Sequence, residues 1–134
     1  MTRQEEIVRE VLDMWTKGPE ETIQTWREHC LPDFIWWNAG RGAVNGLEAA
    51  CQKIEAMHDH LHFHALKVPV RNFMSSGNVV MQERVDELYD EDGKLLFSIP
   101  GVGVVEFDGE KIKEWRDYCD DWVLKASLKE KSQA

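Results

Sequence analysis

The stretch NVVMQERVDELYDEDGKLLFSIPGVGVVEFDGEKIKEWRDYC, residues 78–119, decides the fold of this chain. It contains three segments rich in Val, Ile and Phe, at 78–89, 95–107 and 111–119, and links that contain Asp-Gly separate them. A fourth segment of this kind, at 61–73, comes before them, and the link to the first of the three contains Ser-Gly-Asn. Such links between apolar segments are typical of β-hairpins. The pattern therefore predicts an antiparallel meander of four strands.

The residues before the meander have a helical pattern, because their apolar side chains recur every three or four positions. The expected elements are helices at 2–17, at 19–30 and over about a dozen residues after Asn45-Gly46, a strand at 34–38, a loop at 39–46 and a final helix at 121–130. Helices followed by a meander lie against one face of a curved sheet. We therefore expect a single α+β domain over residues 1–134, a cone closed at one end with a mostly antiparallel sheet.

The charge of the chain limits its partners. Against 16 basic residues stand 25 acidic ones, which gives a formal net charge of −9 at pH 7. Nucleic acids and anionic membranes bind basic surfaces, so neither is an expected partner. The sequence has neither a run of about 18 apolar residues nor a secretion signal, so we expect a cytoplasmic protein. Cys30, Cys51 and Cys119 form no CxxC pair, which favours reduced cysteines over disulfides.

Three charged residues of the meander are candidates for acid–base chemistry. Alternation places Arg84 and Asp86 on one face of their strand, and this pair is either an ordinary surface ion pair or part of a buried site. Asp117 shares a face with Trp115 and Cys119, so it is expected to be buried and to need a partner. Arg84 has five N–H donors and is able to bridge both carboxylates.

Two carboxylates around one arginine share protons unequally. Repulsion raises one pKa while the arginine keeps the other carboxylate ionised, so that one acts as an acid and the other as a base. Opening of an epoxide by water requires both, because the leaving oxygen gains a proton and the water loses one. Gly101 and Gly103, two apart in the adjacent strand, favour sharp curvature or the close approach of another group.

Glu-Arg-Val-Asp at 83–86, Pro-Gly-Val-Gly-Val-Val-Glu-Phe at 100–107 and Trp-Arg-Asp-Tyr-Cys-Asp at 115–120 resemble the catalytic half of limonene-1,2-epoxide hydrolases. This family belongs to the NTF2-like, SnoaL-like superfamily of cone-shaped α+β folds. The resemblance implies that Asp117 is the base that activates water, that Asp86 is the acid that protonates the epoxide oxygen, and that Arg84 orients both. It also implies that Asn38 holds the water, that no cofactor or metal takes part, and that the protein is a homodimer acting on a small apolar epoxide.

One position departs from the family pattern. The family typically has a Tyr two residues before the water-holding Asn, and this chain has Trp36 there. An indole N–H only donates, so Trp36 could hold a water by a lone pair but could not take its proton. Trp36 is also expected to face the cavity and contact substrate, with Trp37 on the opposite face of the strand.

The alternating His58, His60, His62 and His64 form a second noticeable pattern. His58 and His60 are expected near the end of the third helix, so a metal site is not predicted, whereas His62 and His64 are candidates for contacting substrate. Two alternatives to an epoxide hydrolase remain open. One is a lyase, dehydratase or isomerase that uses the same residues on a hydroxylated aromatic or polyketide-like substrate, and the other is a non-catalytic binder with the Arg84/Asp86 pair outside its pocket.

Overall fold

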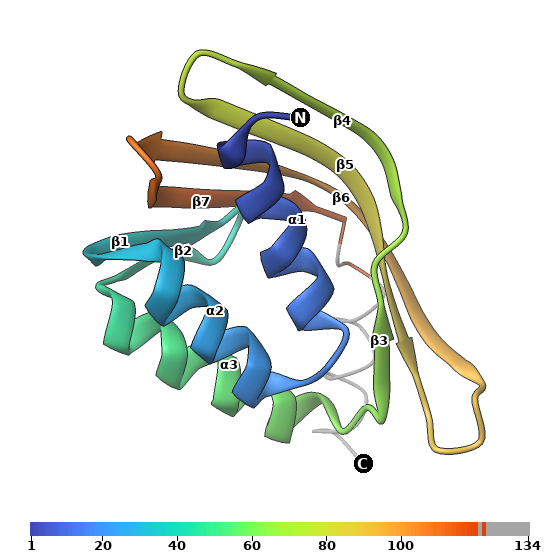
Figure 1. The fold of residues 1–134 in the computed structure, drawn as a ribbon. Helices are drawn as coiled ribbons and strands as arrows, with labels where there is room; N and C mark the ends of the chain where they lie inside the picture. Colours follow the sequence, from blue (N-terminus) through green and yellow to red (C-terminus); the bar gives the residue numbers. More distant parts are fainter. Residues whose placement is uncertain (121, 123–134) are drawn as a thin grey trace.

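A computed structural model describes residues 1–120 and 122, and in it three helices pack on one face of a curved, seven-stranded sheet (Figure 1). The helices are α1 (Arg3–Trp15), α2 (Pro19–His29) and α3 (Leu47–Leu61). The strands are β1 (Cys30–Asn38), β2 (Gly42–Asn45), β3 (Ala65–Lys67), β4 (Val70–Ser76), β5 (Val79–Tyr89), β6 (Leu95–Asp108) and β7 (Lys111–Cys119). This is the expected α+β class. None of the described helices is long and apolar enough to span a membrane.

The strand order is β2-β1-β7-β6-β5-β3. Strand β4 also pairs with β5, on the same edge as β3 but along the first half of β5. All neighbouring pairs are antiparallel except the pair of β1 and β7, which is parallel. The predicted meander is present, but the sheet is larger than predicted. The strand at 34–38 begins earlier, at Cys30, and the predicted loop at 39–46 contains β2.

Two predicted boundaries near residue 61 are wrong. Helix α3 continues to Leu61, into the segment predicted as the first strand of the meander. That strand is also interrupted, because β3 ends at Lys67 and β4 begins at Val70. Pro69 lies in the gap and has no N–H to donate to a ladder, although its carbonyl accepts a hydrogen bond from the Val85 N–H at 3.0 Å. The predicted helix at 121–130 lies, apart from residue 122, outside the described residues.

Local sequence explains where the helices begin. Thr2 and Glu5 form a capping box, in which each side chain accepts a hydrogen bond from the other residue's backbone N–H at the start of α1. Pro19 occupies the first position of α2, where its missing N–H costs no hydrogen bond. Helix α1 buries Ile7, Val8, Val11 and Leu12, which recur at helical spacing and face the sheet.

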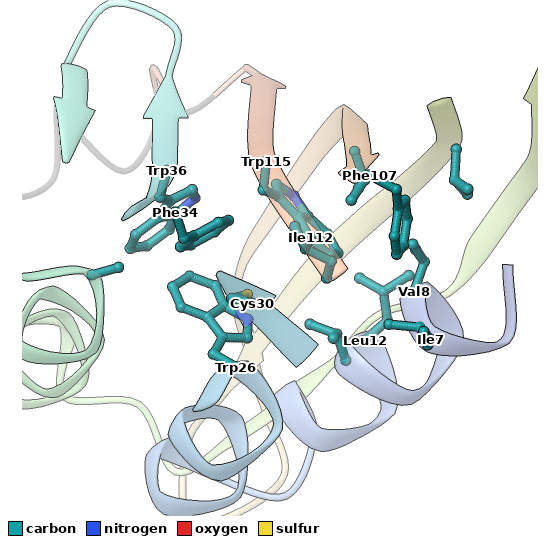
Figure 2. Close-up of a cluster of buried hydrophobic side chains, with 14 residues drawn as sticks. Ile7, Val8, Leu12, Trp26, Cys30, Phe34, Trp36, Phe107, Ile112 and Trp115 are labelled. Atoms are coloured by element: carbon teal, nitrogen blue, oxygen red, sulfur yellow. The ribbon is translucent and has the colours of Figure 1, made fainter. Parts of the chain in front are cut away.

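The core lies between the helices and the concave face of the sheet. Figure 2 shows side chains of α1, α2, β1 and β7 meeting there, with Trp26 of α2 beneath Phe34 and Trp36 of β1. The Trp26 ring packs edge-on against both aromatic rings, with centroids 5.1 Å apart in each case. Edge-to-face pairs of this kind add stability beyond the area that they bury. Trp36 is thus part of the core and is fixed in position.

Two glycines of β6 create a gap in the concave face. Gly103 pairs with Gln82 on one side and with Asp117 on the other, and Gly101 pairs with Arg84 and Cys119 in the same way. Strands β5 and β7 are therefore about 10 Å apart at these rows, with β6 between them. Because β6 presents no side chain here, residues of β5 can reach across it to β7.

We expect Gly103→Ala to close this gap. A Cβ at residue 103 would lie 1.9 Å from Gln82 Oε1 and 2.9 Å from Arg84 Nη1, so both side chains would have to move. The free energy of unfolding in urea should fall by about 1–3 kcal/mol, as it does in other overpacked cores. Val104→Ala is the matched control, because residue 104 is on the same strand but on the opposite face, and it should cost less. Equal stability of Gly103→Ala and the wild type would contradict the gap.

Candidate active site

A cavity of about 200 Å³ opens between the helices and the concave face of the sheet. Its polar residues include Asn38, Arg84, Asp86 and Asp117, which come from β1, β5 and β7. Its apolar wall includes Ile54, Met57, Leu61, Leu66, Leu88 and Ile99. The cavity therefore combines a compact polar site with surroundings suited to an apolar molecule.

Arg84 lies between the two carboxylates that the sequence suggested as its partners. Its Nε is 3.0 Å from Asp86 Oδ1, and its Nη1 is 2.9 Å from Asp117 Oδ1. The side chains of Arg84, Asp117 and Asp86 are 2%, 4% and 19% exposed, respectively. The pair is therefore not an ordinary surface ion pair, and it lies in the cavity rather than outside it.

Every N–H of Arg84 is directed at a neighbouring group. Besides the two contacts above, Nη1 donates to Gln82 Oε1 at 3.1 Å, and Nη2 lies 3.4 Å from Asp86 Oδ2 and 4.0 Å from Cys119 Sγ. The Trp15 ring lies 5.0 Å from the guanidinium carbon, at cation–π distance. Burial alone would lower the pKa of Arg84, but Asp117 and Asp86 outweigh it and raise the pKa, so Arg84 stays charged.

Asp86 and Asp117 differ in their surroundings. Burial raises the pKa of Asp86, and the negative charge of Asp117 adds to this effect, while Arg84 opposes it. Asp117 accepts hydrogen bonds from two indoles, since Trp115 Nε1 donates to Oδ1 at 2.9 Å and Trp36 Nε1 donates to Oδ2 at 3.2 Å. The two carboxyl groups therefore differ: Asp86 has a raised pKa, whereas Asp117 is held by two indole N–H groups and by Arg84.

Asn38 lies beside Asp117 because β1 runs parallel to β7. The two residues are paired in register, and the Ala39 N–H donates to the Asp117 carbonyl at 2.9 Å. Asn38 lines the cavity together with Trp36. Trp37 points to the opposite face of the sheet, where its ring packs 5.1 Å from that of Tyr118. Trp36 thus faces the site as expected, although only 4% of it is exposed and its N–H is already bound to Asp117.

The histidines match the prediction in part, since His58 and His60 lie near the end of α3 as expected. His62 caps the end of α3 in a left-handed conformation (φ 51°) and lies outside the cavity, so the structure does not support it as a substrate contact. His64 lies at the cavity edge. His58, which sequence reasoning did not select, also lines the cavity, and its ring packs edge-on 5.0 Å from that of Phe63. Its helical spacing from Ile54 was the signal that could have identified it.

The chain matches the family model of the limonene-1,2-epoxide hydrolase catalytic domain over residues 9–129, whereas none of the curated proteins matches it in sequence. Solved structures with the same fold include a SnoaL-like polyketide cyclase from Jannaschia sp. CCS1, with a TM-score of 0.79 and 20% identity over 94% of this chain and 91% of that one. An NTF2-like protein of unknown function from Burkholderia pseudomallei K96243 gives a TM-score of 0.76 and 16% identity over 92% and 95% of the two chains. An LEH-like epoxide hydrolase from M. tuberculosis gives a TM-score of 0.73 and 23% identity over 94% and 89% of the two chains. With the match covering most of the sequence, the chain belongs to the limonene-1,2-epoxide hydrolase family.

Proposed function

We propose that the protein is a cofactor-free hydrolase that opens a small apolar epoxide to a vicinal diol. The observation that carries this proposal is the position of Arg84, which contacts both an Asp86 of raised pKa and the buried carboxylate of Asp117. Epoxide opening by water needs an acid and a base at the same time. The two carboxyl groups supply them without a metal ion.

In the proposed reaction, Asn38 and Asp117 hold a water molecule next to the epoxide. Asp117 takes one proton from the water as the water oxygen forms a bond to an epoxide carbon. The bond between that carbon and the epoxide oxygen breaks, and Asp86 gives its proton to this oxygen. The product is a diol, Asp86 is left ionised and Asp117 is left protonated. Return of one proton from Asp117 to Asp86 restores the starting state.

Removal of the acid tests this assignment. We expect Asp86→Asn to lower kcat by about 10²- to 10⁴-fold, because an amide cannot supply the proton of a carboxylic acid. Glu83→Gln is the matched control, since residue 83 is on the same strand and its exposed side chain lies on the opposite face. The measurement is diol formation from a panel of small cyclic epoxides, with circular dichroism to confirm folding. A fully active, folded Asp86→Asn variant would refute the acid role.

The pH dependence gives a second test. Asp86 acts in its protonated form, and its raised pKa keeps the proton bound to a higher pH than for an ordinary aspartate. We therefore expect kcat to be high on the acidic side of this raised pKa and to fall as the pH increases through it. A rate that instead rises with pH across the same range would exclude Asp86 as the acid. The profile is measured from diol formation at a series of pH values between roughly pH 4 and pH 9, the range in which perturbed carboxyl groups titrate.

One observation favours a second candidate function, a lyase, dehydratase or isomerase. Asp117 accepts from Trp36 and Trp115 as well as from Arg84, whereas Asp86 accepts from Arg84. Asp86 is therefore the carboxyl group that fewer fixed donors hold. A single acid–base group is sufficient for an elimination or isomerisation on a hydroxylated substrate.

Labelled water distinguishes these functions. In water enriched in the heavy isotope of oxygen, we expect the epoxide to yield a diol that carries one labelled oxygen. Product formation from a hydroxylated aromatic or polyketide-like substrate without label would support elimination or isomerisation instead. Saturable binding of the same compounds with no product would support a non-catalytic binder.

A further inference from the structure

Asp117 has few remaining positions at which it could take up a proton. A carboxylate offers about four lone-pair directions. Oδ1 already contacts two donors, Arg84 Nη1 at 2.9 Å and Trp115 Nε1 at 2.9 Å. Oδ2 accepts from Trp36 Nε1 at 3.2 Å. Counted over residues 1–120 and 122, these donors leave one lone pair of Oδ2 for a further donor.

The Trp36 donor cannot turn away from Asp117. Its ring is 4% exposed and packs edge-on against Trp26, with centroids 5.1 Å apart. Trp36 and Trp115 are paired in register on the parallel strands β1 and β7, and Figure 2 shows both indoles among the side chains of the core. An indole N–H also never accepts a hydrogen bond, whereas a hydroxyl group at this position would be able to rotate and do so.

From these contacts we propose that Trp36 is the residue that selects the reacting lone pair of Asp117. It holds Oδ2 by a fixed N–H, directs the one open lone pair at the nucleophile, and leaves Asn38 as the other side chain that positions the nucleophile. Trp36 acts through Asp117 and is therefore a positioning residue. This inference rests on the proposed role of Asp117 as the base.

The fixed donor sets the orientation of the carboxylate. Trp36, Trp115 and Arg84 all contact Asp117, so the carboxylate is held in a single orientation. Removal of the Trp36 N–H should loosen this orientation while the other two contacts remain.

Other ionisable groups line the same cavity as Asp117. Those on the sheet are Arg84 and Asp86 of β5 and Cys119 of β7, and those at the other walls of the cavity are Lys17, Arg41, His58 and His64. A substitution that keeps all of these groups is therefore needed to isolate the effect of Trp36. Trp36→Phe meets this requirement, because it removes the N–H and retains an aromatic ring.

We expect Trp36→Phe to lower kcat by about 10- to 100-fold and to change KM little, because the variant loses one hydrogen bond to a charged group but keeps an aromatic ring in the same place. Trp37→Phe is the matched control, since Trp37 is the next residue and packs on the opposite face against Tyr118. It should leave kcat unchanged. Equal kcat values for the wild type and a folded Trp36→Phe would overturn the inference while leaving epoxide hydrolysis intact.

A measurement without turnover keeps the inference separable from the proposed function. In hydrogen-exchange NMR, the Nε1–H of Trp36 should exchange with solvent slowly in the wild type and faster in Asp117→Ala, because that variant lacks the carboxylate that accepts from it. The Nε1–H of Trp37, on the opposite face, is the control and should exchange alike in both proteins. A wild-type Trp36 N–H that exchanges as fast as that of Trp37 would overturn the inference, whether or not a variant folds and whether or not the enzyme opens epoxides.

Discussion

The buried guanidinium of Arg84 is the constraint on which the rest of the site depends. Removing a charged group from water is strongly unfavourable unless partners surround it, and Arg84 contacts Asp86, Asp117 and Gln82. With both aspartates ionised, this buried group carries one net negative charge. One added proton makes it neutral. The raised pKa of Asp86 is the consequence, because burial favours the neutral arrangement.

The glycines of β6 are what make this pairing possible. Arg84 and Asp117 belong to strands that are not neighbours, so their side chains meet only where the strand between them carries none. Gly103 pairs with Gln82 and Asp117 in one row, and Gly101 pairs with Arg84 and Cys119 in the next. A backbone feature of β6 therefore determines an electrostatic feature of β5 and β7. The absence of a side chain at residue 103 is as specific a requirement as the presence of Arg84.

The sequence was sufficient to predict which site residues share a face of one strand. It was not sufficient to predict which residues meet because strands far apart in the sequence pair with each other. Alternation placed Arg84 and Asp86 together, and the Trp and Cys beside Asp117 indicated that it is buried. By contrast, the parallel pairing of β1 with β7, which sets Asn38 against Asp117, leaves no local pattern. His62 was selected because a strand was expected to begin at residue 61, whereas α3 continues to that residue and brings His58 to the cavity instead.

The core and the candidate site are a single packed unit. Trp36 fills the core against Trp26 of α2 with one part of its ring and donates to Asp117 with its N–H. Helix α2 has no side chain on Asp117, yet its packing fixes the direction of that donor. A change at Trp26 would therefore reach the carboxylate through one intervening ring, because a close-packed interior transmits displacement. For this reason a substitution in the core of this protein also changes the packing behind the groups that hold Asp117.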